Sequence, residues 1–140
     1  MKITIITMEH EGRLSNSKKE NGSEIKTRCS DYARFFDRNI PYWTFDPEMN
    51  MSYLRSKEIY ANWLLKHRGY LFLNEVYDML GMPKSKDGQV VGWVYSKEKP
   101  IGDNYVDFGI YDIYDPKVVK VDERSILLDF NVDGFILDKI

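Results

Sequence analysis

Aspartates are frequent in the C-terminal half of the sequence, and two of them lie where they could act together. Asp107 falls in the segment YVDFGIY and Asp129 in SILLDF, and the apolar pattern of each segment predicts a strand. If the strands are neighbours in register, the two carboxylates could serve as general acid and base, or hold Mg²⁺ in a nuclease-like site. The alternative is a pair of solvated side chains on the wet face of an antiparallel sheet. We favour this alternative, because no lysine or histidine base can be placed beside them.

Other residue types that often carry catalysis are scarce. His10 stands between two glutamates, but adjacent residues of an extended chain point to opposite faces, so we predict no metal site there. His67 lies between Lys66 and Arg68 at the end of a predicted helix, where positive charge complements the helix dipole. Cys29 is the single cysteine, which excludes an intramolecular disulfide and the zinc-binding spacings. Neither glycine-rich phosphate motif occurs, and we predict no cofactor.

Composition and charge narrow the classes of protein that remain. The 140 residues are 43% hydrophobic and 30% charged, which is typical of one globular domain spanning residues 1–140. The net charge of −2 argues against a nucleic-acid binder, although Lys18, Lys19 and Arg28 would be the residues of a weak basic site. No apolar run approaches the roughly 18 residues that span a bilayer, and Glu9 interrupts the N-terminal one. We therefore expect a cytoplasmic protein without membrane contact.

Aromatic residues make up 14% of the chain, and one group of them stands apart. Tyr42, Trp43 and Phe45 lie in the segment PYWTF, between two predicted helices. Exposed aromatics of this kind would form a binding hot spot, whereas buried ones would fill the space between the helices. We expect Trp43 to be buried and Tyr42 and Phe45 to be candidates for contact. These three residues are the predicted partner-binding site.

Three helices are predicted, and they precede the main run of strands. A short helix over 32–38 has aromatic residues on one face. A long helix begins after the N-cap Asp46 and runs over 47–68, with Gly69 as its left-handed C-terminal residue. A second amphipathic helix covers 70–80 and stops at a glycine followed closely by a proline.

Strand signals lie at both ends of the chain and dominate the C-terminal third. The clearest is a hairpin over 125–140 with a turn at 131–134, where Gly134 suits a left-handed position. The segregation of helices and strands predicts an α+β fold: a helical layer on a C-terminal antiparallel sheet, to which an N-terminal strand could add. The predicted strands are 2–8, 24–28, 90–95, 105–111, 125–130 and 135–140, with a further extended piece at 118–121.

Four segments carry a resemblance to a known family. They are LFLNEVYDMLGMP, VVGWVY, GDNYVDFGIYD and RSILLDFNVDGFILDKI. They resemble a family of unassigned reaction that is encoded by tailed phages and prophages of Gram-positive bacteria. The match covers the second half of the chain, and the predicted long helix fits as well. The resemblance implies a phage origin and a place in the host cell cytoplasm or in the assembled virion.

Three functional hypotheses remain, in the following order. The first is a non-enzymatic phage protein that acts through protein–protein contacts, as a virion or tail-region component or as an inhibitor of a host factor. Its partner would be a phage structural protein or a bacterial host protein, and edge strands could also pair copies into a homo-oligomer. The second is a small metal-dependent hydrolase or nuclease that uses Asp107 and Asp129. The third is a nucleic-acid-binding module that uses Lys18, Lys19 and Arg28.

Overall fold

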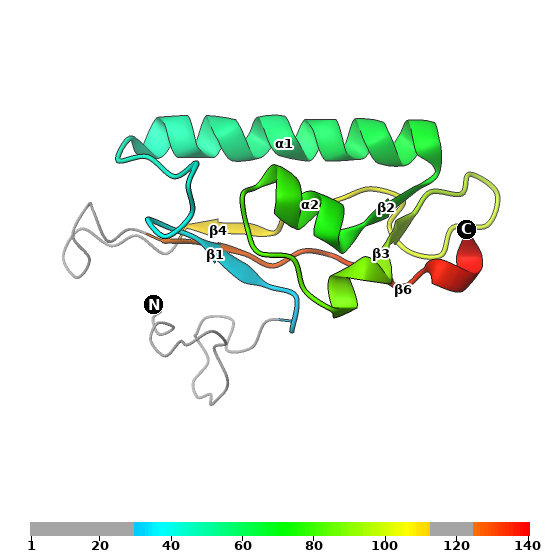
Figure 1. The fold of residues 1–140 in the computed structure, drawn as a ribbon. Helices are drawn as coiled ribbons and strands as arrows, with labels where there is room; N and C mark the ends of the chain where they lie inside the picture. The colour runs from blue at the N-terminus through cyan, green and yellow to red at the C-terminus, as the bar shows by residue number, and fades with distance from the viewer. Residues whose placement is uncertain (1–29, 113–124) are drawn as a thin grey trace, which may run out of the picture. The chain divides into compact units, whose positions relative to one another are not determined.

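The fold combines helices with two small antiparallel sheets. The computed structural model describes residues 30–112 and 125–140 (Figure 1). These residues form two α-helices and six short strands. The α+β class is therefore confirmed. The strands form two three-stranded sheets, whereas a single sheet was predicted. The predicted strands at 2–8 and 24–28 and the extended piece at 118–121 lie outside the described residues.

The contacts divide the chain into two compact units. The first holds residues 1–37 and 109–130, and the second holds 38–108 and 131–140. The single domain expected from the length stays a prediction. In the described part of both units, no helix combines the length and the apolar character needed to cross a membrane.

The first unit contains a sheet with strand order β1-β5-β4. Its strands are β1 (Arg34–Phe36), β5 (Ile126–Leu128) and β4 (Ile110–Asp112), all antiparallel to their neighbours. Every residue of β5 is buried, so this central strand is covered on both faces. Phe36, which pairs with Ile126, is also fully buried. Apolar side chains on the central and first strands therefore form the core of this unit.

The short helix predicted over 32–38 is wrong. The apolar spacing there would fill less than two turns, and a helix that short has little stability of its own. The backbone of Arg34–Phe36 instead pairs with β5, a strand from the far end of the sequence. A distant partner therefore decided the conformation, and no local pattern could reveal it.

The second unit is organised on α1 (Pro47–Arg68), the longest element in Figure 1. As predicted, the Asp46 carboxylate accepts the backbone N–H groups of Glu48 and Met49 at 3.0 and 3.4 Å. Gly69 ends the helix with φ of +94°, and its N–H donates to the carbonyl oxygen of Leu65 at 2.8 Å. The buried side chains of this unit include Leu54, Ala61, Leu65, Leu71, Leu73, Val76, Tyr77, Leu80, Trp93, Val106, Phe108 and Ile136.

The helix predicted over 70–80 is correct only in its second part. Tyr70–Phe72 forms β2, and α2 covers Leu73–Met79. β2 pairs with β3 (Val91–Val94), so strand pairing prevails over the amphipathic helical pattern at these three residues. Glu75 stabilises the junction, because its carboxylate accepts the backbone N–H of Phe72 at 3.0 Å.

The C-terminal hairpin predicted over 125–140 is wrong, although Gly134 takes a positive φ of +128° as expected. Its two strands belong to different sheets: β5 lies in the first unit, whereas β6 (Gly134–Phe135) pairs with β3. The supposed turn runs along β3 instead. There the backbone N–H of Asp133 donates to the carbonyl oxygen of Gly92 at 2.9 Å. A 3-10 turn, Leu137–Lys139, replaces the end of the predicted last strand.

Of the strand predicted over 105–111, only the last two residues are in a strand, which is β4 (Ile110–Asp112). Residues 105–108 form no strand, and the backbone N–H groups of Val106 and Phe108 donate to the side chains of Asn62 and Glu58 instead. The predicted alternation is nevertheless present, because Val106 and Phe108 are buried while Tyr105 and Asp107 are exposed. Burial therefore follows the sequence pattern even where the hydrogen bonding does not.

Candidate partner-binding surface

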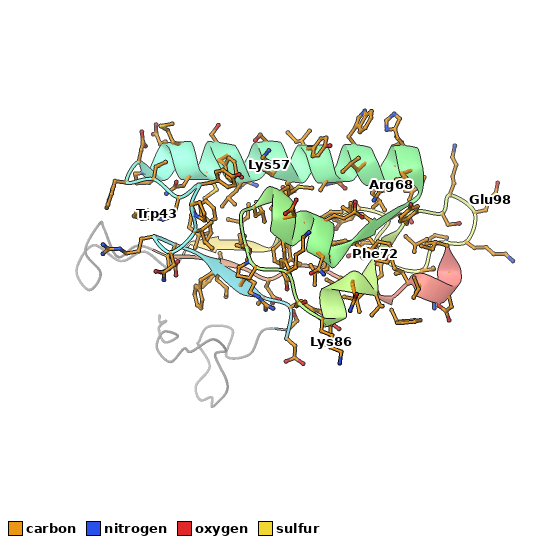
Figure 2. All side chains as sticks on the ribbon, in the orientation of Figure 1. Trp43, Lys57, Arg68, Phe72, Lys86 and Glu98 are labelled. Carbon is orange, nitrogen blue, oxygen red and sulfur yellow. The ribbon has the colours of Figure 1, made fainter. Side chains whose placement is uncertain are left out.

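The predicted partner-binding residues lie in one loop of the second unit, just before α1. We call residues 42–45 the aromatic loop. A turn closes it, in which the backbone N–H of Trp43 donates to the carbonyl oxygen of Ile40 at 3.0 Å. Tyr42 is 52% exposed and Phe45 is 62% exposed, whereas Trp43 is half-buried. Trp43 and Arg68 lie at opposite ends of α1 in Figure 2.

One buried asparagine holds the backbone of the aromatic loop in place. Asn50, in the first turns of α1, is only 2% exposed. Its Oδ1 accepts the backbone N–H of Thr44 at 2.8 Å and the Thr44 hydroxyl at 3.0 Å, and its Nδ2 donates to the Thr44 carbonyl oxygen at 2.8 Å. The side chain thus satisfies both backbone groups of Thr44. Because each bond lies in a partly buried setting, the loop is held in one conformation.

The ring of Tyr42 packs against two further residues, Tyr53 and Gly81. Its ring centroid lies 5.4 Å from that of Tyr53, whose hydroxyl donates to the Met79 carbonyl oxygen at 2.7 Å. Burial, and secondarily the neighbouring Tyr42, raises the pKa of Tyr53 to about 12. Gly81 leaves room for Tyr42, since a Cβ there would stand 2.8 Å from the Tyr42 Cδ2 atom. One face of the Tyr42 ring is therefore packed while half of its surface stays exposed.

Trp43 and Phe45 form an edge-to-face pair next to Tyr42. Their ring centroids are 4.9 Å apart and their planes meet at 73°. The indole N–H of Trp43 is buried and finds no hydrogen-bond acceptor among the described residues. A buried donor without an acceptor is uncommon, because it loses its hydration without compensation. The loop thus offers apolar ring surface on a fixed backbone, which is the chemistry of contact rather than of proton transfer.

A second group of exposed large apolar residues lies on α1 itself, and the sequence pattern indicated it only in part. Ile59, Tyr60 and Trp63 are 71%, 49% and 55% exposed. His67 is exposed, as expected of a residue that complements the helix dipole. Its ring stacks on Trp63 with centroids 4.3 Å apart, and its Nδ1 lies 2.9 Å from the Trp63 carbonyl oxygen. The broad apolar spread along this helix could have indicated that some of these residues face outward.

The two aspartates singled out for chemistry are not in strands, so that expectation is wrong. Asp107 lies before β4 in the second unit, where its N–H donates to Asn131 Oδ1 at 2.7 Å. Asp129 follows β5 in the first unit, and its Oδ1 accepts the backbone N–H and the hydroxyl of Ser30 at 3.2 and 2.9 Å. No group of three or more metal-binding side chains gathers within residues 30–112 and 125–140. A shared metal site for the pair stays a prediction.

A different carboxylate pair, Asp103 and Asp133, was missed, because Asp133 was assigned to the predicted turn at 131–134 and the sequence pattern gives no sign that Asp103 lies near it. Asp133 Oδ2 accepts the backbone N–H of Val94 at 2.9 Å. Burial raises the pKa of Asp133 above its ordinary value, the hydrogen bond from Val94 opposes that rise, and the charge of Asp103 adds to it. The nearby Asn131 joins this region to the core, since its Oδ1 accepts the indole N–H of Trp93 at 2.8 Å. These contacts bind the last residues of the chain to β3.

Three more asparagines repeat the arrangement seen at Asn50, and sequence reasoning missed all of them. In each case Oδ1 accepts the N–H, and Nδ2 reaches the carbonyl oxygen, of one backbone residue. Asn62 binds Val106 in this way at 2.7 and 2.9 Å. The available signal was an asparagine in the interior of a predicted helix, where this residue is a poor helix former. The other two pairs are Asn74 with Ser85 and Asn104 with Ser96.

Lys18, Lys19 and Arg28, the weak nucleic-acid candidates, lie outside the described residues, as do His10 and Cys29.

Comparison with known proteins places the chain in a family without assigning an activity. A family model described as "Family of unknown function (DUF6353)" matches residues 6–140, and the chain therefore belongs to this family. No curated protein and no solved structure matches the chain.

Proposed function

We propose that this member of the DUF6353 family acts through protein–protein contact and not through catalysis, with the aromatic loop as its contact surface. The protein would be encoded by a tailed phage or prophage of a Gram-positive bacterium. It would serve as a component of the virion or tail region, or as an inhibitor of a host factor in the host cytoplasm. The sequence segments that resemble phage proteins support the origin, and the aromatic loop supports the mode of action.

The observation that carries the proposal is the combination of exposure and rigidity in the aromatic loop. Tyr42 and Phe45 each expose more than half of their surface. The backbone beneath them is fixed by Asn50, whose bonds to Thr44 are 2.8–3.0 Å long. Ordering a loop on binding costs free energy, and a loop that is ordered beforehand avoids that cost. Aromatic side chains on such a support are favourable binding anchors.

The chemistry of the surface also indicates the kind of partner. Phe45 presents an apolar ring, and Tyr42 presents a ring with a hydroxyl that can donate a hydrogen bond at the rim of an interface. The Lys57 ammonium lies 5.5 Å from the centre of the supporting Tyr53 ring. The partner expected from these features is a protein surface that has an apolar pocket for the Phe45 ring and a hydrogen-bond acceptor for the Tyr42 hydroxyl.

Quantitative affinity capture tests the proposal. The chain would be immobilised and exposed to purified virions and to lysates of infected and lysogenic host cells. We expect one or a few proteins to be captured, and Phe45→Ser and Tyr42→Ser to reduce their recovery at least about tenfold. Circular dichroism melting would show that each variant remains folded.

The chain offers matched control variants for both substitutions. Tyr105 is 50% exposed and Phe135 is 51% exposed, and both lie outside the aromatic loop. Tyr105→Ser and Phe135→Ser should leave the capture unchanged. If all four variants captured the same proteins equally, or if the unmodified chain captured none from any fraction, the proposal would be wrong.

A further inference from the structure

The outer face of α1 is made of side chains that nothing in the second unit covers. We define this face by Ser52, Ser56, Ile59, Tyr60 and Trp63, all of which are exposed. At 100° per residue they lie opposite the stripe of α1 that enters the core. The buried residues of that stripe are Asn50, Leu54, Ala61 and Leu65.

Side-chain size changes along this outer face. Between residues 52 and 63 the face changes from the small residues Ser52 and Ser56 to the bulky residues Ile59, Tyr60 and Trp63. Met49, which is 59% exposed, lies N-terminal to the two serines. Ile59, Tyr60 and Trp63 are 71%, 49% and 55% exposed, and a group of exposed large apolar residues is informative where a single one is not. Between residues 52 and 63, the surface at the two serines is therefore lower than the surface at the three bulky side chains.

Charge changes along α1 in the same direction. The N-terminal turn carries Glu48, preceded by Asp46 as the cap, and the last turn carries Lys66 and Arg68 together with His67. The helix dipole is itself positive at the N-terminus and negative at the C-terminus. Between Ile59 and Arg68 the sequence IYANWLLKHR has no acidic residue.

We propose that the outer face of α1 pairs with the same face of a second copy of this chain, as an antiparallel dimer with two-fold symmetry. With the two-fold axis between Lys57 and Glu58, the bulky Trp63 of each copy lies over the small Ser52 of the other. The Glu48 end of each helix then lies beside the Lys66 end of its partner. Size and charge are both complementary only in this orientation, because parallel helices would set bulky residues and like charges against each other.

A second copy fits this face better than a lipid surface would. A helix that lies on a membrane needs an apolar face along its whole length, flanked by basic residues. Here the face is polar at Ser52 and Ser56, and Glu48 places an acidic group at one end. A self-complementary patch is instead what a two-fold interface requires, since every contact occurs twice. The proposal is independent of the aromatic loop and of its partner.

Sedimentation equilibrium of the full chain over a range of concentrations tests the dimer directly. We expect a monomer–dimer equilibrium in which Ile59→Ser and Trp63→Ser each raise the Kd at least about 30-fold. Ile101 is 44% exposed and lies outside α1, so Ile101→Ser is the matched control and should leave the Kd unchanged. A chain that stays monomeric at every concentration, whether or not it binds anionic phosphatidylglycerol vesicles, would overturn the proposal.

Charge reversal tests the antiparallel orientation. Glu48→Lys or Lys66→Glu alone should weaken the dimer, because each places like charges together at both ends of the interface. The double variant carrying both reversals should recover most of the affinity. If the double variant is weaker than either single variant, the helices do not pair antiparallel.

Disulfide trapping tests the register, with Cys29→Ser as the background so that only the new cysteine can react. Across the proposed axis, the two Ser56 positions differ by about 5 Å along the helix axes and the two Ser52 positions by about 16 Å. Ser56→Cys should therefore form an interchain disulfide on mild oxidation, and Ser52→Cys should not. Cross-linking at both positions would indicate parallel helices and overturn the proposal, as would cross-linking at neither.

Discussion

The aromatic loop and the outer face of α1 expose similar side chains but are built in different ways. Tyr42 and Phe45 are 52% and 62% exposed, and Tyr60 and Trp63 are 49% and 55% exposed. The loop takes its shape from residues that are buried or distant in sequence, such as Asn50 and Gly81. The outer face needs only the regular backbone of the helix.

Equal exposure therefore does not mean equal dependence on the rest of the fold. Removing a support of the aromatic loop should cost stability and also displace the binding surface. Removing a side chain from the outer face should leave the folded monomer as stable as before. Four substitutions test this contrast, and their expected effects on stability decrease in the order given.

Asn50→Ala should have the largest effect. The substitution leaves the backbone N–H and carbonyl oxygen of Thr44 without their partner in a partly buried site. We expect the free energy of unfolding to fall by about 3 kcal/mol, since each unsatisfied buried group costs about 1–3 kcal/mol. Thermal denaturation should show a Tm lower by about 9 °C.

The control for Asn50→Ala is Ser52→Ala, an exposed position two residues further along the same helix. In dilute solution, where any dimer has dissociated, it should change the Tm by less than about 2 °C. An equal loss in both variants would mean that the clamp on Thr44 contributes nothing specific.

Gly81→Ala should have the next largest effect, and Gly69→Ala separates its two causes. Both glycines have positive φ, +75° and +94°, so alanine is strained at either position. A Cβ at Gly81 would also stand 2.8 Å from the Tyr42 ring, whereas a Cβ at Gly69 meets nothing within 4 Å. We expect losses of about 2 kcal/mol and about 1 kcal/mol in chemical denaturation. Equal losses would show that Tyr42 does not pack on Gly81.

Tyr53→Phe should have a smaller effect that depends on pH. The substitution removes the hydrogen bond from the Tyr53 hydroxyl to the Met79 carbonyl oxygen, at a cost of about 1 kcal/mol near neutral pH. The pKa of Tyr53 is raised from 10.0 to about 12 in the folded protein, so the folded state keeps this proton when the unfolded state loses it. The associated stability is complete below pH 10 and is lost as the pH rises toward 12.

The measurement for Tyr53 is the free energy of unfolding of both proteins as a function of pH. The difference between the unmodified chain and Tyr53→Phe should shrink over that alkaline range and stay constant below it. A difference that is constant at all pH values would contradict the raised pKa.

Ile59→Ser should have the smallest effect on the stability of the monomer. Ile59 is 71% exposed, so its replacement removes little buried apolar surface. We expect a change within about 0.5 kcal/mol in dilute solution, where any dimer has dissociated. A loss of more than about 1 kcal/mol under these conditions would show that the outer face is packed within the monomer.

Elements whose stabilising contacts are local could be predicted from the sequence. Asp46 and Gly69 mark the two ends of α1, because capping depends on residues within one turn. The apolar run of β3 and the helical spacing in α2 were also sufficient to predict these elements. For the candidate site, the residue types and the loop position singled out Tyr42 and Phe45 as candidates for contact, and both are exposed.

The pairing of the strands and the support of the aromatic loop depend on contacts between residues that are distant in sequence. β5 and β6 are close in sequence and resemble a hairpin, yet they join β1 and β3 in different sheets. The asparagine at position 50 gives no local sign that it binds Thr44, and the asparagine at 62 gives none that it binds Val106. The backbone of a strand and the amide of an asparagine side chain find their hydrogen-bond partners only when the chain folds. A helix forms its backbone hydrogen bonds within one segment of the sequence.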